Sequence, residues 1–519
     1  MRPHADGMTE GKPSRDAGDA TPANALCAGY TKEENRHACA WRFLYACKKV
    51  FLRRGPQDDI IKTGFKSARK SCAFFSRHGG MNILKVGVVS LGCSKNRVDT
   101  ELMLDILKKA GYEITADESD ADVLIVNTCG FIDPAKQESI DTLLELAQYK
   151  QTGHLKLLAA TGCLVQRYEQ ALLDDMPEVD LLLGVSEYER LPQAIQEALQ
   201  GKRPSYCHRD SHILEGERVL TTAPYSAYIR IADGCDNRCA YCAIPLIRGG
   251  FRSRSIESVL SEIRQLAEQG VREFTLVAQD TSRFGIDVHG KSLLPELMVR
   301  AANIPGVEWL RVLYCYPDEV DDELLEAMAS KPNICKYLDL PLQHADPELL
   351  RRMNRRGDMD STRRLLKKAR DMGFTLRTTF IVGFPGETEE QFETLMDFTR
   401  EMEFDRMGAF AYSVEEDTPA AVMPDQIDEE VKQERLDRLM ACQQEISLRR
   451  NRQRVGDIET VLVEAVADDG SGTGRSSREA PEETDGVIRL TGLAESDIGT
   501  FIRARITGAD IYDLMGEKL

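Results

Sequence analysis

The sequence predicts an α/β protein in three parts: an N-terminal parallel α/β domain, a partial (βα)6 barrel and a small C-terminal β-barrel. Between residues 83 and 201, short apolar runs alternate with helical patterns, as in a parallel α/β unit. Between residues 221 and 452 the alternation continues with longer helices. From residue 453 to residue 519 the pattern changes to alternating apolar positions with many glycines, which indicates a β-barrel.

The length and composition agree with several folded domains. The chain has 519 residues, of which 42% are hydrophobic, and about 100–200 residues per domain gives three or four domains. The composition excludes a disordered, fibrous or collagen-like chain. No apolar run of about 18 residues occurs in it, so no transmembrane segment and no membrane partner are predicted.

Residues 1–80 differ from the rest of the chain. They carry 15 Lys and Arg against 8 Asp and Glu, a net of +7, whereas the whole chain is at −18 and the remainder therefore at −25. They show neither clear periodicity nor a secretory signal pattern. Because a predicted strand follows Met81 at once, we expect Met81 to be the natural start and residues 1–80 to be a leader or an upstream extension. The spacing of their cysteines matches no zinc finger: Cys27, Cys39, Cys47 and Cys72.

Each part has its own predicted elements. The strands of the first are Leu84–Ser90, Val123–Asn127, Leu157–Ala160 and Leu181–Gly184. The helices between them cover about residues 99–110, 134–149, 165–173 and 190–199. The strands of the second part make six βα units: Ala227–Ala232, Glu273–Ala278, Trp309–Leu313, Tyr337–Leu340, Leu376–Val382 and Gly408–Tyr412. A charged helix over about residues 427–454 leads to the last part, where alternation is clearest at Thr460–Val463, Val487–Leu490 and Phe501–Ala504.

The strongest chemical signal is a group of three cysteines after the first barrel strand. Cys235, Cys239 and Cys242 lie within eight residues, in a loop at the carboxyl ends of the strands, where barrel enzymes place their sites. Three ligands to a four-iron cluster leave one iron open, whereas structural zinc takes four protein ligands. The alternative, three unpaired structural cysteines, is disfavoured by this spacing and location.

A second group of three cysteines follows the first three predicted strands. Cys93, Cys129 and Cys163 each lie at the carboxyl end of a parallel strand, the edge where open α/β sheets bind ligands. Each has a glycine beside it that allows a tight turn: Gly92, Gly130 and Gly162. A single cysteine of this kind is more often a buried structural thiol. Together, the three predict a second cluster with three ligands.

Other strand ends also carry polar or glycine-rich segments. Residues 383–388 (Gly-Phe-Pro-Gly-Glu-Thr) connect a strand to a helix; their amides suit an anion, but taken alone a tight turn with a threonine cap is favoured. Residues 279–281 and 340–344 end the second and fourth barrel strands, and such residues line barrel sites. His344 by itself is weak evidence of function. The other cysteines form no set: Cys207, Cys315, Cys335 and Cys442.

The spacing Cys-x3-Cys-x2-Cys, with Tyr241 before its last cysteine, resembles the radical S-adenosylmethionine (SAM) enzymes. The upstream cysteines and the order of the parts are similar to the methylthiotransferases among them, over nearly all of residues 83–519 and none of residues 1–80. The resemblance implies two 4Fe–4S clusters, the one on Cys93, Cys129 and Cys163 being auxiliary, and a C-terminal TRAM domain. It also implies a set of SAM-binding or cofactor-supporting residues: Tyr241, Gln279, Gln343, Gly383, Gly386 and Glu387.

Two types within this family compete. The RimO type modifies an aspartate of ribosomal protein S-twelve, and the alternative, the MiaB type, modifies an adenosine in tRNA. Residues 90–99 (Ser-Leu-Gly-Cys-Ser-Lys-Asn-Arg-Val-Asp) are similar to the RimO signature, where the tRNA type usually has Gly-Cys-Gln-Met-Asn. Residues 233–235, 338–344 and 474–482 also resemble the RimO type, although Glu479 replaces its usual aspartate and preserves the charge.

The charge of the last part favours the same type. Residues 453–519 carry 14 acidic and 7 basic side chains, whereas a barrel that binds tRNA should present Lys and Arg to phosphates. An acidic surface suits a basic ribosomal protein. We therefore expect methylthiolation of the aspartate β-carbon in the cytoplasm, with flavodoxin or ferredoxin as electron donor. Two other classes remain open, a binding module with structural clusters and a lyase or mutase with one cluster, which needs no upstream cysteines.

Overall fold

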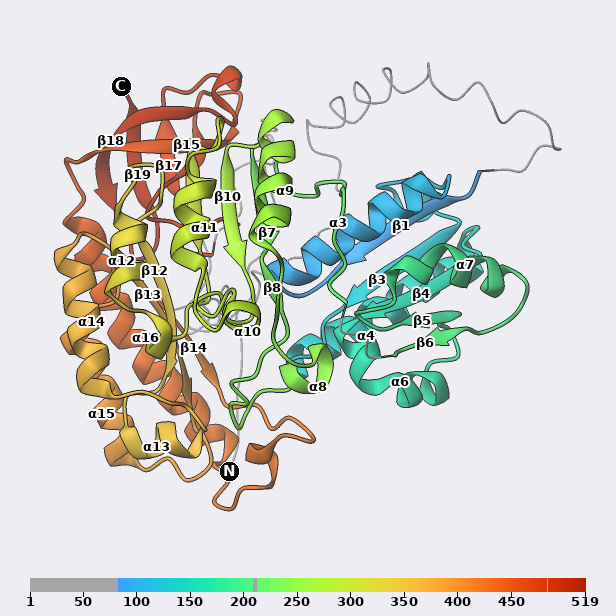
Figure 1. The fold of residues 1–519 in the computed structure, drawn as a ribbon, viewed down its shortest axis with the longest axis horizontal. Coiled ribbons are helices and arrows are strands. Elements are labelled where there is room, and N and C mark those ends of the chain that lie inside the picture. The colour runs from blue at the N-terminus through green and yellow to red at the C-terminus, as the bar shows by residue number, and fades with distance from the viewer. Residues whose placement is uncertain (1–82, 209–211, 483) are drawn as a thin grey trace, which may run out of the picture. The chain divides into compact units, whose positions relative to one another are not determined.

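The computed structural model describes residues 83–208, 212–482 and 484–519, and Figure 1 shows the course of the chain through them. The three predicted parts lie within these residues. The expectations about Met81 as the start, about residues 1–80 and about their four cysteines fall outside them. No helix of the described part is long and apolar enough to span a membrane.

The N-terminal part is a six-stranded parallel sheet between two layers of helices (Figure 1). The strand order is β2-β1-β3-β4-β5-β6, with β1 (Lys85–Ser90), β2 (Glu113–Ile114), β3 (Val123–Thr128), β4 (Leu157–Gly162), β5 (Leu181–Leu183) and β6 (Ser205–Tyr206). Side chains of β3 alternate between two apolar cores. Val123 and Ile125 face the core that includes α3 (Ser94–Lys109) and α7 (Leu191–Leu199). Leu124 and Val126 face the core that includes α4 (Asp133–Ala147) and α6 (Cys163–Asp175).

The helices of this part overlap the predicted segments, although the first begins at Ser94, five residues before its predicted start. The edge strands do not appear among the predictions. The helices are α3 (Ser94–Lys109), α4 (Asp133–Ala147), α5 (Tyr149–Thr152), α6 (Cys163–Asp175) and α7 (Leu191–Leu199). All four predicted strands are present within one or two residues. The sequence analysis missed β2 and β6, because a strand of two residues is too short to show a period.

The second part contains the six predicted strands as two parallel sheets, β11-β10-β7 and β12-β13-β14, which a backbone bridge between Leu310 and Ile334 joins into a partial barrel. The strands are β7 (Ser226–Arg230), β10 (Glu273–Val277), β11 (Trp309–Val312), β12 (Tyr337–Gln343), β13 (Thr375–Val382) and β14 (Arg406–Ala411). The larger helices pack against them around one apolar core (Figure 1): α9 (Ile256–Glu268), α11 (Leu294–Ala301), α12 (Asp322–Ala329), α14 (Met359–Asp371) and α15 (Glu389–Met402).

Local capping explains where these barrel helices begin. At the start of α9, α12, α14 and α15, a side-chain oxygen accepts a hydrogen bond from the backbone N–H three residues further on. This satisfies one of the free N–H groups at each helix terminus. The capping residues are Ser255, Asp321, Asp358 and Thr388.

The C-terminal part is a closed five-stranded barrel, reached through α16 (Glu429–Arg452) (Figure 1). Its strand order is β15-β16-β17-β19-β18, with β15 (Ile458–Val466), β16 (Gly472–Ser476), β17 (Ile488–Thr491), β18 (Phe501–Ala509) and β19 (Leu514–Lys518). The predicted alternation is confirmed in β15, β17 and β18, whose inward residues form the core. The sequence analysis missed β16 because it reads as a glycine-rich loop, yet a Cβ on Gly474 would lie 2.5 Å from the Leu462 carbonyl oxygen.

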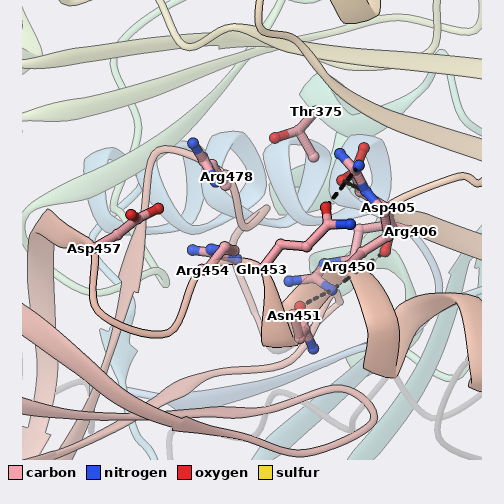
Figure 2. Close-up of a pocket in the computed structure, with 9 residues that line it drawn as sticks. All are labelled: Thr375, Asp405, Arg406, Arg450, Asn451, Gln453, Arg454, Asp457 and Arg478. Carbon is pink, nitrogen blue, oxygen red and sulfur yellow. Dashed lines mark hydrogen bonds and ion pairs between the residues drawn. The ribbon is translucent and has the colours of Figure 1, made fainter.

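The joint between the two barrels contains a cavity of about 240 Å³ beside the amino ends of β13 and β14 (Figure 2). Asp405 and Arg450, which both line it, pair at 2.9 Å. Next to it, buried Glu479 pairs with Arg406 at 3.0 Å and Arg454 at 2.5 Å. Burial alone would raise the pKa of Glu479, but these two arginines hold it well below its ordinary value. The cavity lies at the opposite strand ends from the cysteines, so we interpret it as part of a structural joint.

We predict that Glu479→Gln lowers the free energy of unfolding by about 3 kcal/mol at neutral pH, because it removes the shared partner of two buried arginines. The folded-state pKa lies below the ordinary 4.5, so this contribution is complete above that pH and is lost as the pH falls below it. Denaturant unfolding should therefore show a gap between the two proteins that narrows in acid. Glu495→Gln, at an exposed position, is the control, and an equal effect of both variants would contradict the prediction.

Candidate functional site

The loop with the first three cysteines is closed at its base by two short strands. After β7, β8 (Ala232–Asp233) pairs antiparallel with β9 (Arg252–Ser253), and α8 (Ile244–Arg248) lies between them in the chain. The Cys235 N–H donates to the Gly249 carbonyl at 3.1 Å. Gly234 has a φ of +74°, and a Cβ there would lie 2.1 Å from the Gly250 carbonyl oxygen. Only glycine fits this close approach.

The three thiols of this loop lie close together in an environment of low polarity. Burial, with smaller contributions from Asp280 and the neighbouring Cys239, raises the pKa of Cys235 to about 11. Burial and Cys239 also raise the pKa of Cys242. Tyr241 lies beside the Cys239 thiol, because burial and then Cys239 raise the pKa of the Tyr241 hydroxyl. Sulfurs buried in this way become thiolates when a metal centre replaces their protons.

The sequence analysis missed one cation beside these thiols. Arg355 Nη1 lies 3.8 Å from Cys239 Sγ, its Nη2 donates to the Pro341 carbonyl at 2.5 Å, and its guanidinium lies 4.1 Å from the centroid of the Tyr316 ring. Electrostatically, such a cation favours negative charge on the sulfur. In the sequence, Arg355 is one of several neighbouring arginines, so no sequence signal indicated which of them lies beside the cysteines.

The end of β10 offers an unsatisfied amide next to this loop. Gln279 has both side-chain polar atoms buried, and neither has a hydrogen-bond partner among the residues described. The following Asp280 is already used, because it accepts hydrogen bonds from Asn237 at 2.7 Å and Ser282 at 2.5 Å. Buried amides rarely lack partners. A polar cofactor in contact with Gln279 would satisfy it, so the residues present fit the predicted SAM site.

Strained backbone also gathers at the carboxyl ends of the barrel strands. Arg238, Tyr314 and Gln343 have positive φ values of 50°, 65° and 72°. The first lies in the cysteine loop, and the other two follow β11 and end β12. Side chains adopt this region of φ at an energetic cost and are found there most often at functional sites.

The segment 383–388 forms the predicted turn with a threonine cap. Thr388 and Gln391 make a capping box at the start of α15, and Gly383 and Gly386 have positive φ. The Glu387 carboxylate is buried; it accepts from the Gly383 N–H and Arg435 and pairs with His344 at 3.1 Å. Both His344 nitrogens have protein partners, so this histidine is a satisfied structural group. A contact of these residues with SAM stays a prediction.

The second three cysteines meet at one edge of the N-terminal sheet. They follow β1, β3 and β4, which are adjacent strands. A Cβ on Gly92 would lie 3.2 Å from Cys129 Sγ, so Cys129 lies against the residue next to Cys93. Burial raises the pKa of Cys163 to about 11, and Cys93 contributes to the rise. The sheet thus brings residues separated by up to seventy positions to the same edge. That they hold a cluster stays a prediction.

A buried arginine joins this edge to the loop with the other three cysteines. Arg248, the last residue of α8, donates to Asp99 and Asn96 at 2.8 Å each and to Asp233 at 3.2 Å. Its Nη2 lies 3.8 Å from Cys163 Sγ. Asp99 and Asn96 belong to the helix that follows Cys93, and Asp233 precedes Cys235 by two residues. The two sets of cysteines are therefore fixed relative to each other.

A second contact joins the same two parts near Cys129. Buried Glu415, in the loop after β14, pairs with Arg167 at 2.7 Å and Lys136 at 3.1 Å. Arg167 also donates to the carbonyl of Gly130, next to Cys129, at 3.2 Å. The far end of the partial barrel is thereby attached to the helices that follow the second and third cysteines.

Three family models match the chain. Residues 85–184 match the uncharacterized protein family UPF0004, residues 229–399 match the radical SAM superfamily, and residues 455–518 match the TRAM domain. Together with the fold, these matches define a radical SAM enzyme with a C-terminal TRAM barrel, a class that uses SAM and an iron–sulfur cluster.

Curated relatives narrow the class. The chain is 51% identical over 439 residues to "Ribosomal protein uS12 methylthiotransferase RimO" of Desulforamulus reducens, a match covering 83% of this chain and 99% of that protein. The protein of the same name from Heliobacterium modesticaldum is 51% identical over 84% of this chain and 95% of its own length. The one from Clostridium botulinum strain Loch Maree is 46% identical over 84% and 98%. The chain belongs to the RimO family of radical SAM methylthiotransferases.

Solved structures are more distant. The methyltransferase TsrM from Kitasatospora setae, with cobalamin and a [4Fe-4S] cluster bound, is 17% identical at a TM-score of 0.49, covering 66% of this chain and 77% of that chain. The cobalamin-dependent radical enzyme OxsB, with aqua-cobalamin bound, is 12% identical at a TM-score of 0.44, covering 76% of this chain and 62% of that one.

We predict that Gln279→Leu weakens SAM binding three- to tenfold, about the value of one hydrogen bond, and leaves the melting temperature nearly unchanged. Equilibrium dialysis of SAM against the iron-loaded protein measures the first quantity and thermal unfolding the second. Gln166→Leu is the matched control, since the Gln166 amide is fully hydrogen-bonded to Cys207 and Val185. It should lower stability and spare SAM affinity; the reverse pattern would contradict the prediction.

Proposed function

We propose that this protein adds a methylthio group to the β-carbon of an aspartate in ribosomal protein S-twelve. The observation that carries the proposal is the pair of cysteine sets joined through Arg248, in a chain of the RimO family. Sulfur insertion and radical formation need two centres at a fixed separation, and the buried contacts of Arg248 with Asp99 and Asp233 supply that constraint.

In this proposal Cys235, Cys239 and Cys242 hold the 4Fe–4S cluster that binds SAM. Gln279 and Gln343 contact SAM from the strand ends, and Tyr241 covers the cluster. Gly383, Gly386 and Glu387 support the site from the turn before α15. When bound, the cofactors supply the sulfur, the methyl group and the radical that removes a hydrogen atom from the substrate. The protein orients the substrate and excludes water.

Cys93, Cys129 and Cys163 hold the second 4Fe–4S cluster. Cys93 is the N-cap residue of α3 and Cys163 is the first residue of α6. Helix N-termini carry partial positive charge and favour thiolates. Arg248 adds a full positive charge at 3.8 Å from Cys163 Sγ. These features support a cluster whose cysteine ligands are negatively charged.

The charge of the C-terminal barrel supports a basic protein as the substrate. The buried charges of this barrel sum to zero, because it buries two arginines, Arg454 and Arg475, and two carboxylates, Glu479 and Asp485. The excess of 14 acidic over 7 basic residues therefore belongs to the rest of the barrel. Such a surface repels nucleic-acid phosphates and steers a basic partner. The proposal includes a cytoplasmic site of action and flavodoxin or ferredoxin as the electron donor.

We predict that S-twelve loses the mass of its methylthio group in a strain that lacks this protein, while tRNA nucleosides keep theirs. Mass spectrometry of ribosomal proteins and of digested tRNA from the same cells measures both. A plasmid copy of the gene should restore the modification. Loss from tRNA with S-twelve unchanged would overturn the substrate and favour the tRNA type.

We predict about eight irons per reconstituted chain, as two four-iron clusters require, and about four irons with no methylthiolation for Cys93→Ala. Iron analysis and mass spectrometry of the product give the two readouts. Cys442→Ala, a partly exposed thiol on α16, is the control and should keep about eight. Four irons in the unchanged protein, or methylthiolation by Cys93→Ala, would exclude the second cluster.

A further inference from the structure

Lys95 is a buried lysine next to the second cysteine set. It is the second residue of α3, two positions after Cys93, and only 8% of it is exposed. Its ammonium lies 3.6 Å from the centroid of the Tyr314 ring. Within the described ranges, no hydrogen bond or ion pair to this ammonium is found. A buried ammonium without an anionic partner is rare.

The carboxylates near Lys95 are already paired with other groups. Asp339 accepts from Arg377 at 2.7 Å and from the Tyr314 N–H at 2.9 Å. Asp99 is held by Arg230 and Arg248. Another buried lysine shows the usual arrangement: Lys432, which is 1% exposed, pairs with Glu429 at 2.5 Å. Among the described residues, Lys95 therefore has no carboxylate of its own in direct contact.

The position of Lys95 places this charge between the two cysteine sets. Its helix starts at the sheet edge with Cys93, whereas Tyr314 follows β11 at the mouth of the partial barrel. Tyr314 has a positive φ of 65°, and its carbonyl accepts a hydrogen bond from the Thr281 N–H, in the loop after β10, at 3.0 Å. The Lys95 ammonium therefore lies between the helix that begins after Cys93 and the strand end at the mouth of the partial barrel.

We propose that Lys95 binds the carboxylate of the aspartate that is modified and thereby selects an acidic side chain. This inference rests on the proposed function, because it assumes that the substrate is an aspartate. The carboxylate is bonded to the β-carbon, so an ion pair with Lys95 fixes the carbon from which hydrogen is removed. A desolvated, charge-assisted hydrogen bond is strong and directional, and a neutral amide or base gains little from it.

The test compares binding of two forms of S-twelve to the iron-loaded enzyme, one with its aspartate and one with asparagine in its place. Fluorescence anisotropy of labelled S-twelve gives both affinities. The unchanged enzyme should bind the aspartate form about tenfold more tightly, the value of one charge-assisted contact. Lys95→Met should bind both forms equally, and Lys95→Arg should keep the preference. Lys109→Met, an exposed lysine on the same helix, is the control and should also keep it.

Two results would overturn the inference: equal binding of both forms by the unchanged enzyme, or an undiminished preference in Lys95→Met. If Lys95→Met loads less iron than the unchanged enzyme, Lys95→Gln gives a second neutral variant, for which the same loss of preference is expected and a retained preference overturns the inference. A damaged fold lowers both affinities together and leaves their ratio unchanged. Failure of the proposed function appears separately, as absence of methylthiolation of S-twelve by the unchanged enzyme.

Discussion

The ion network around Arg248 fixes the geometry on which the proposed chemistry depends. Arg248 and Arg230 share Asp99, and Arg248 also reaches Asp233. Such a buried network adds little net stability compared with apolar packing, although removal of one member leaves an uncompensated charge and costs about 3–5 kcal/mol. The network contributes orientation more than stability, because its directional ion pairs hold the loop with Cys235 against the helix that follows Cys93 in a single arrangement.

The strands could be predicted from the sequence because their signals are local, and the same local signals led to the prediction of both cysteine sets. Cys235, Cys239 and Cys242 share one loop. Cys129 and Cys163 directly follow β3 and β4, and Cys93 comes three residues after the end of β1. The position of a parallel strand's carboxyl end then determines where the residue after it lies. The turn at 383–388 was predicted correctly for the same reason, since a capping box needs only four consecutive residues.

The charged residues around these sets could not be predicted, because their partners are distant in the chain. Arg248 contacts Asn96 across 152 positions, and Lys95 meets Tyr314 across the junction of two domains. In a sequence, a buried arginine or lysine looks the same as one on the surface. The small strands were missed for a different reason: β16 contains two glycines, so its position follows from close backbone packing and not from a pattern of side chains.

The two sets of cysteines also differ in when they become available during folding. Cys235, Cys239 and Cys242 span eight residues and are near one another even in an unfolded chain, because a short loop closes easily. Cys93, Cys129 and Cys163 meet only after β1, β3 and β4 have paired, which requires contacts between distant segments. In the proposed function, the cluster at the sheet edge therefore requires a folded N-terminal domain, whereas the cluster of the loop requires only a short segment of chain.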